Sequence, residues 1–285
     1  MKRFRGDPDK SRRYHDRVAR QYDAIYDDPY WEYHDELTWS SIKPHLPRDL
    51  ALPCADLGCG TGKWAMRLLK SGFAVTLVDH SGAMVEQARG KVAAMGNKAA
   101  RATLLQADMI DLSALSDGQF ALVLSMGDPL SICVDPAAAV REMNRICRPG
   151  GIVIASADNQ LAAIDHYAKS GDLDGLETLV ATGRVRWLTA DPGEQFDLTT
   201  FTPASLRRLF ERAGFEVLDT IGKTILPVRK YPQLLARPDA VRRMLKLEAQ
   251  LGRDPAAAAV AGHLQITARK PATPDTPHIR DAASP

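Results

Sequence analysis

The chain has 285 residues, of which 37 are lysine or arginine and 35 are aspartate or glutamate, so its formal net charge is +2. Its hydrophobic fraction of 45% and charged fraction of 25% are ordinary for a globular protein and exclude a largely disordered or collagen-like chain. The length allows a core without disulfide or metal support, and the near-balance of charge leaves no large basic excess for neutralising nucleic-acid phosphates.

The N-terminal segment and the cysteines bear on the cellular compartment. Residues 1–13 are basic and polar and lack the apolar core of a signal peptide, so we expect a disordered, solvated terminus. No apolar stretch approaches the ~18 residues of a membrane-spanning helix. The four cysteines form no CxxC pair and no paired zinc spacing, which predicts no metal site and favours a reducing, cytoplasmic location.

An aromatic segment follows over residues 14–52. We expect it to form one or two helices, interrupted at Pro29, that make a helical cover for the rest of the chain. Its aromatic residues are Tyr14, Tyr22, Tyr26, Tyr30, Trp31, Tyr33 and Trp39.

From residue 53 onward the sequence pattern predicts alternating strands and helices. The predicted strands are 55–57, 73–78, 103–106, 120–125 and 151–156, and the predicted helices are 64–70, 83–95 and 136–147. This alternation is typical of βαβ units with right-handed crossovers, and it predicts a doubly wound, mostly parallel sheet.

The alternation stops at residue 158. Residues 158–200 read as an insertion that covers the substrate, with helices at 159–169 and 173–181 and a strand at 184–188. Regular structure resumes with a helix at 204–213, a strand at 215–221, an amphipathic helix at 231–251 and a last strand at 263–269. One domain over 53–269 and a disordered, proline-rich tail over 270–285 complete the expected organisation.

Three alternating glycines mark the turn between the first strand and the first helix of this domain. Gly58, Gly60 and Gly62 permit positive φ and close approach of a ligand to the backbone and to the helix N-terminus. The turn does not match the dinucleotide fingerprint G-x-G-x-x-G, because Lys63 occupies the position of the third glycine. It does not match a phosphate-binding loop either, because Trp64 follows that lysine where the motif requires serine or threonine. The turn therefore indicates a nucleotide-type ligand without a required pyrophosphate.

Two acidic residues end the next two strands. Asp79 lies 21 residues after Gly58, a spacing that suits a carboxylate holding ribose hydroxyls, and Asp108 ends the neighbouring strand. Ribose, adenine and a short charged tail would fit this arrangement.

Several motifs in register resemble those of the class I S-adenosylmethionine-dependent methyltransferases. They are Asp56-Leu57-Gly58-Cys59-Gly60-Thr61-Gly62, Leu77-Val78-Asp79-His80-Ser81, Gln106-Ala107-Asp108-Met109, Phe120–Leu124, Cys147-Arg148-Pro149-Gly150-Gly151 and Phe201–Phe215. The resemblance implies a Rossmann-like α/β fold, doubly wound, with a mostly parallel seven-stranded sheet and an antiparallel last strand. It also implies S-adenosyl-L-methionine as the cofactor.

The resemblance further implies roles for individual residues. Asp79 would hold the ribose hydroxyls, Asp108 would accept from the adenine amino group, and Tyr22 would cover the cofactor. The full implied cofactor set is Tyr14, Tyr22, Asp56, Gly58, Cys59, Gly60, Gly62, Asp79, His80, Met84, Asp108, Met109, Ser125 and Met126.

Groups able to accept a proton lie where a doubly wound sheet places its substrate. Asp128 and Asp158 follow predicted strands, and His15 lies in the aromatic segment, so these three are the candidate catalytic residues. The two aspartates could equally serve as turn or helix caps. Candidate substrate contacts are Tyr26, Trp31, Asn159, His166 and Trp187.

The sequence thus predicts methyl transfer to an O or N atom, less favourably a C atom, of a small molecule, mainly by positioning and desolvation. The chain could act as a homodimer. RNA or protein methylation and a non-catalytic cofactor-binding regulatory module remain alternatives, since fold does not fix function. An open basic groove would mark the first of these, and only a short basic terminus is present.

Overall fold

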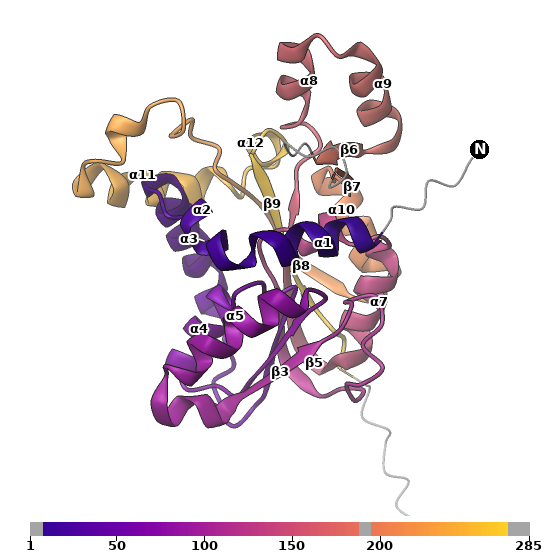
Figure 1. Ribbon diagram of the computed structural model, residues 1–285. Helices are drawn as coiled ribbons and strands as arrows, with labels where there is room; N and C mark the ends of the chain where they lie inside the picture. Colours follow the sequence, from indigo (N-terminus) through magenta and orange to yellow (C-terminus); the bar gives the residue numbers. More distant parts are fainter. Residues whose placement is uncertain (1–7, 188–194, 273–285) are drawn as a thin grey trace, which may run out of the picture.

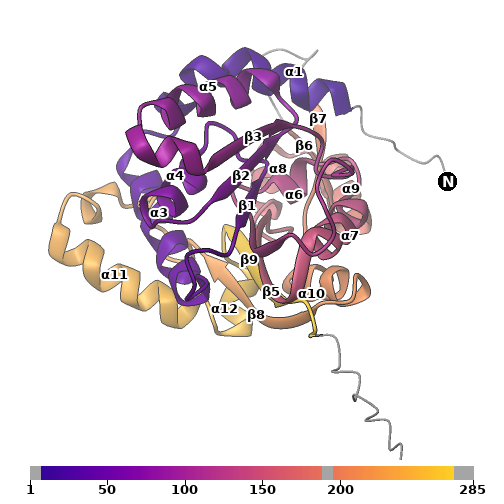
Figure 2. The same cartoon turned by 90° about the horizontal axis from the view of Figure 1, so that it is seen from below.

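A computed structural model describes residues 8–187 and 195–272. It contains a seven-stranded sheet in the order β3-β2-β1-β4-β5-β9-β8, with helices on both faces (Figures 1 and 2). The strands are β1 (Cys54–Leu57), β2 (Val75–Asp79), β3 (Ala102–Gln106), β4 (Phe120–Ser125), β5 (Cys147–Asp158), β8 (Glu216–Lys223) and β9 (His263–Arg269). The first five run parallel, and β9 runs antiparallel to both β5 and β8, which confirms the predicted fold class.

Helices cover the two faces as distinct layers. The helices are α1 (Pro8–Val18), α2 (Tyr22–Ile25), α3 (Pro29–Ile42), α4 (Lys63–Lys70), α5 (Gly82–Ala93), α6 (Pro129–Ile132), α7 (Pro136–Ile146), α8 (Ile164–Ser170), α9 (Leu173–Thr182), α10 (Pro203–Arg212), α11 (Pro238–Leu251) and α12 (Pro255–Ala259). Helices α3, α4 and α5 lie on one side of the sheet, and α7 and α10 lie on the other (Figure 2).

The central strands are apolar on both faces because both faces are covered. In β4, Leu122 and Leu124 pack in the core on the α4 side, and Val123 packs in the core on the α7 side. Strands buried this way read as continuous apolar runs, which is why their positions were predictable from the sequence. The strand order reverses at β1, whose neighbours are β2 and β4, so a crevice opens at the carboxyl ends of β1 and β4.

Several predicted boundaries were wrong for identifiable reasons. Residues 8–13 are helical rather than disordered, because α1 packs along α5. The helix predicted over 231–251 begins at Pro238, after a short 3-10 segment (Pro232–Leu234), since each proline lacks the N–H that a helix interior requires. The insertion contains a hairpin of β6 (Arg184–Trp187) and β7 (Phe196–Thr199), of which the second strand was not predicted. Residues 1–7 and 273–285, predicted to be disordered, lie outside the described residues.

Within the described ranges, no helix combines the length and the apolar character needed to cross a membrane.

Asn159 follows β5 and connects it to the segment before β9. Its Nδ2 donates to the carbonyl oxygens of Ala259 (2.9 Å) and Ala261 (2.7 Å), with Ala258 at 3.4 Å, and its Oδ1 accepts from the backbone N–H of Leu161 (3.2 Å). The side chain is 2% exposed. The prediction that Asn159 contacts substrate is therefore wrong: its polar atoms are all used within the fold.

We expect Asn159→Ala to destabilise the protein, because it leaves buried carbonyl groups without donors. The free energy of unfolding should fall by about 1–3 kcal/mol, measured by chemical denaturation. Asn97→Ala is the matched control, since Asn97 is exposed and should leave the midpoint unchanged. Unaltered stability together with a raised KM for a methyl acceptor would instead return Asn159 to the substrate contacts.

Candidate active site

Two adjoining cavities open at the carboxyl ends of β1 and β4. The smaller has a volume of ≈ 70 Å³ and the larger a volume of ≈ 910 Å³. They share walls formed by His15, Tyr22, Gly58, Gly60 and Gly127, among others. Two ligands bound in them would therefore lie next to each other.

The glycine turn after β1 separates the two cavities from the sheet. Gly58 has φ +64°, and a Cβ there would lie 2.4 Å from the side chain of Pro129, so any larger residue would force the turn away from α6. Gly60 has φ +54°, and a Cβ there would face the ring of Tyr22 at 3.8 Å. The turn thus favours glycine at both positions for its backbone conformation, and at Gly58 also for the close approach of Pro129.

Asp79, at the end of β2, fixes this turn. Its Oδ2 accepts from the backbone N–H of Gly60 (2.8 Å) and its Oδ1 accepts from the backbone N–H of Ser81 (2.9 Å). Asp108 likewise accepts from the N–H of Ile110 (3.1 Å). The structure brings half of the predicted cofactor residues together around the smaller cavity: Tyr22, Gly58, Gly60, Asp79, His80, Asp108 and Met109.

Four predicted cofactor residues line neither cavity. Met84 is fully buried against Val18 and Ala19 of the N-terminal segment, and Ser125 is buried at the end of β4. Gly62 forms the left-handed N-cap of α4. Those three lie behind the site rather than in it.

The fourth is Asp56, which lies beneath the turn. Its Oδ2 accepts from the backbone N–H of Ala65 (2.9 Å), so it positions the start of α4. Burial raises the pKa of Asp56 to about 7, with a smaller contribution from Asp79. Asp56 therefore supports the turn from below.

Two carboxylates of the N-terminal helices form hydrogen bonds that hold these helices over the site. Asp16 of α1 accepts from the Ser81 hydroxyl (2.5 Å), at the start of α5. Asp23 of α2 accepts from the Thr61 hydroxyl (2.6 Å) and pairs with Lys91 Nζ (2.6 Å). Both contacts join the cover to the elements that follow β1 and β2.

Aromatic side chains form much of the larger cavity. The rings of Tyr22 and Tyr26 lie 4.9 Å apart, Tyr26 and Trp31 lie 4.9 Å apart, and Tyr14 lies 6.0 Å from Phe196 of β7. All five line the cavity, as do the predicted cofactor residues Cys59 and Met126. The aromatic cover and the β6–β7 hairpin therefore meet over the same space.

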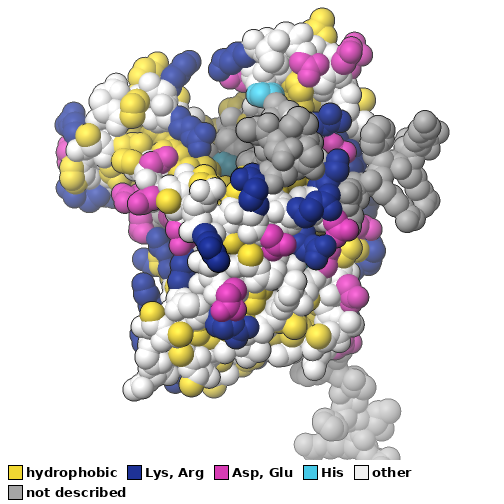
Figure 3. Space-filling model, in the orientation of Figure 1, with side chains coloured by type: hydrophobic (Ala, Val, Ile, Leu, Met, Phe, Trp, Pro, Cys, Tyr) yellow, Lys and Arg dark blue, Asp and Glu magenta, His cyan; other side chains and the backbone are white. Residues whose placement is uncertain are grey.

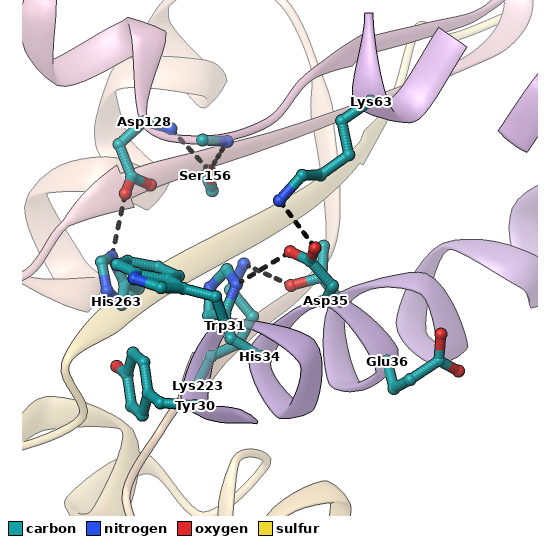
Figure 4. A network of polar contacts seen from close by, with 12 residues as sticks. Tyr30, Trp31, His34, Asp35, Glu36, Lys63, Asp128, Ser156, Lys223 and His263 are labelled. Carbon is teal, nitrogen blue, oxygen red and sulfur yellow. Dashed lines mark hydrogen bonds and ion pairs between the residues drawn. The ribbon is translucent and has the colours of Figure 1, made fainter. Parts of the chain in front are cut away.

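The polar end of the larger cavity holds Asp128, Asp158 and His263, from three separate segments. Asp128 Oδ2 lies 2.9 Å from His263 Nδ1, and the backbone N–H of Asp128 donates to Ser156 Oγ (3.0 Å; Figure 4). One oxygen or nitrogen atom from each of the three lies within 4.8 Å of the others. Both predicted aspartates thus line the larger cavity, and His263 was not among the predicted site residues.

The three groups change one another's protonation. Burial by itself raises the pKa of Asp128, but the nearby His263 and Lys223 outweigh it and hold that pKa well below its usual range. Burial and the Asp128 carboxylate raise the pKa of Asp158 to about 7. Burial opposes protonation of His263, yet the Asp128 carboxylate prevails and raises its pKa.

A second polar group lies on the adjoining wall. Lys63 Nζ pairs with Asp35 Oδ2 (2.7 Å), and Asp35 Oδ1 lies 3.5 Å from His34 Nδ1 (Figure 4). Lys223, 1% exposed, donates to Thr38 Oγ1 (3.0 Å), and burial lowers its pKa to about 8. Burial, followed by the Lys223 charge, lowers the pKa of His34 to about 4.

The other predicted residues fall as follows. His15 lines both cavities, with Nδ1 2.8 Å from the carbonyl of Ser11, and burial lowers its pKa. His166 is exposed on α8, which projects away from the sheet with α9 (Figure 1), and it lines neither cavity, so the prediction of a substrate contact is wrong there. Trp187 belongs to β6, and its side chain lies outside the described part of the chain.

Comparisons with known proteins agree with this geometry. A family model described as a methyltransferase domain matches residues 54–151. Demethylmenaquinone methyltransferase from Staphylococcus aureus (strain JH9) is 26% identical over 208 residues, which make up 70% of this chain and 81% of that protein.

Solved structures share the fold. A methyltransferase from Mesorhizobium loti, described as S-adenosylmethionine-dependent, has a TM-score of 0.57 and 22% identity, covering 82% of this chain and 97% of its own. The [4+2]-cyclase SpnF has a TM-score of 0.60 and 20% identity, covering 92% of this chain and 95% of its own. At such identities the likeness concerns the fold.

The sheet, its switch point and the paired cavities define a doubly wound α/β protein with a nucleotide-type ligand site. The matched domain and the curated relative identify it further: the chain is a class I S-adenosylmethionine-dependent methyltransferase. It is an enzyme, and S-adenosylmethionine is its cofactor.

We expect the double variant Asp16→Ala/Asp23→Ala to loosen the helical cover. Exposed polar contacts of this kind contribute about 0–1 kcal/mol each, so amide exchange in residues 8–25 should accelerate by about two- to fivefold, measured by hydrogen–deuterium exchange. The sheet should exchange at its original rate. Asp165→Ala, which removes an exposed ion pair on α8, is the control. Uniform acceleration across the chain would mean that the two carboxylates stabilise the whole fold rather than the cover.

Proposed function

We propose that this methyltransferase methylates an O or N atom of a small, largely apolar molecule bound in the larger cavity. The observation that carries the proposal is the cavity itself. Its volume of ≈ 910 Å³ suits a small molecule, it adjoins the smaller cavity, and its walls combine aromatic rings with charged and polar side chains. Such a chamber aligns an acceptor and excludes water, and these are the main requirements of an in-line displacement on an activated methyl group.

The smaller cavity, together with the part of the larger cavity that adjoins it, is the proposed site for the nucleoside part of the cofactor. S-Adenosylmethionine, when bound, supplies a methyl group on a sulfonium. Asp79 is proposed to accept from the ribose hydroxyls and Asp108 from the adenine amino group, with His80 and Met109 beside the ring. Gly127 supports this fit, since it lines both cavities and a Cβ there would meet no atom within 4 Å.

A site covered by the N-terminal helices favours a small acceptor over RNA or protein. The N-terminal helices are fastened across the cavity by Asp16 and Asp23, so a polymer would have to displace them. On the face seen in Figure 3, the described residues mix acidic and basic side chains and form no continuous basic strip. Phosphate recognition over an extended surface would require such a strip.

The cofactor assignment predicts a binding defect. Asp79→Ala should weaken S-adenosylhomocysteine binding at least ~10-fold in isothermal titration calorimetry, because hydrogen bonds to a charged group contribute about 1.5–3 kcal/mol. Asp49→Ala, an exposed residue before β1, should bind as the unaltered protein does. Equal affinity in both variants would remove the ribose role of Asp79.

The acceptor assignment is tested by screening for homocysteine-product release. Phenols, aliphatic alcohols, amines and reduced demethylmenaquinone should be compared with bulk RNA and protein as acceptors. We expect turnover with an apolar phenol or amine, and Trp31→Ala should raise the KM for it about 10-fold or more while S-adenosylhomocysteine affinity is unchanged. Methylation of RNA or protein alone would overturn the proposal. Cofactor binding without methylation of any acceptor would favour the regulatory module.

A further inference from the structure

We infer that His263, held by Asp128, takes the proton from the acceptor during methyl transfer. The inference deepens the proposed function and depends on it: it names the base of the same site. Three observations support it, namely the fixed geometry of the pair, the charges that surround it, and the properties of the other candidate bases.

The pair is held rigidly. Asp128 has φ +63°, a left-handed conformation that is uncommon for a residue with a side chain and that occurs where the surrounding structure demands it. The backbone N–H groups of Gly127 and Asp128 both donate to Ser156 Oγ at 3.0 Å, which fixes the turn after β4. The carboxylate is thereby aimed at His263 Nδ1, 2.9 Å away (Figure 4).

This contact determines which nitrogen is free. A carboxylate only accepts, so Nδ1 of His263 donates to it, and the lone pair of the neutral ring lies on Nε2. No hydrogen-bond partner of Nε2 is found among the described residues, and the side chain lines the larger cavity. An acceptor in that cavity can therefore present its proton to Nε2.

Sheet pairing surrounds His263 with charged groups. In the antiparallel register it stands opposite Asp158 of β5 on one side and opposite Lys223 of β8 on the other. From α3, the His34 ring lies 5.2 Å away. Other charged or titratable groups that line the same cavity include Asp35, Lys63, Tyr26 and Arg229, the last of which lies over the Trp31 ring beside His263. Asp128 is the carboxylate in direct contact with the ring and favours its protonated form, whereas Lys223 and burial oppose it.

The alternatives are less suitable. Asp158 has its pKa raised to about 7, so near neutral pH much of it already carries a proton. His15 is bonded to Ser11 in its own helix and has a lowered pKa, which makes it a weaker base than His263. Among the described residues, His34 also lies beside a carboxylate (Asp35) and lines the larger cavity, but burial and the Lys223 charge lower its pKa to about 4, which makes it a weaker base than His263.

The proposed step balances as follows. The acceptor oxygen or nitrogen forms a bond to the methyl carbon, and the carbon–sulfur bond breaks with its electron pair remaining on sulfur. The proton of the acceptor moves to Nε2 of His263. The positive charge lost from sulfur thus reappears on the imidazolium, beside the Asp128 carboxylate, and the proton later passes to water.

The test uses the full-length enzyme, S-adenosylmethionine and the best acceptor of the screen. In the unaltered enzyme, kcat should rise with pH through the raised pKa of His263, since only the neutral ring accepts a proton. His263→Asn keeps a donor for Asp128. It should lower kcat about 10²–10⁴-fold and abolish the rise of kcat with pH, while the affinity for S-adenosylhomocysteine stays unchanged. Asp128→Asn should shift the rise of kcat to lower pH. His166→Asn, exposed outside both cavities, is the control.

A second measurement separates chemistry from folding. Histidine NMR titration should show a signal whose pKa is raised above the ordinary histidine value; this signal should be absent in His263→Asn, and its pKa should fall in Asp128→Asn. An active enzyme whose pH profile is unchanged by His263→Asn would overturn the inference while leaving the proposed function intact. Loss of activity with EDTA and recovery with Mg²⁺ or Zn²⁺ would overturn it too, because the cluster would then hold a metal ion. Failure of the unaltered enzyme with every acceptor would remove the proposed function and this inference together.

Discussion

The parallel pairing of β1 with both β2 and β4 is the constraint from which the site follows. Because chain connections leave β1 in opposite directions, the turns after β1 and β4 diverge and leave a crevice at their carboxyl ends. Asp79, one strand away, binds the turn after β1 through the N–H of Gly60. The sheet therefore fixes the position of the proposed cofactor site before any side chain selects a ligand.

Much of this architecture was predictable because strong local patterns encode it. The strand at 120–125 is an apolar run and the strand at 263–269 has an alternating pattern, and both coincide with the observed strands. The glycine turn is likewise recognisable because few other structures require its residues. The boundaries that failed depend on tertiary contacts. The start of α1 depends on packing against α5, and β7 depends on pairing with β6 rather than on its own sequence.

The polar end of the larger cavity could be predicted only in part. Asp128 and Asp158 come soon after predicted strands, and this position in the sequence made them candidate site residues. His263 sits in an alternating strand where it reads as an ordinary residue, and only the antiparallel register places it opposite Asp158. The same holds for Lys223, which no local pattern distinguishes from a surface lysine but which is 1% exposed. Long-range register, unlike a turn motif, leaves no short sequence signature.

The division between cofactor and acceptor sites also explains what the family resemblance can and cannot determine. The matched methyltransferase domain, residues 54–151, contains the glycine turn, Asp79 and Asp108. Most of the larger cavity comes from outside it: the N-terminal helices, the β6–β7 hairpin, and the strand that carries His263. A cyclase shares the fold, so the sheet alone does not determine the reaction. We therefore expect these outer segments to select the acceptor. Burying several charged groups beside the aromatic walls of the larger cavity is unfavourable for folding, so we interpret these groups as a requirement of the chemistry.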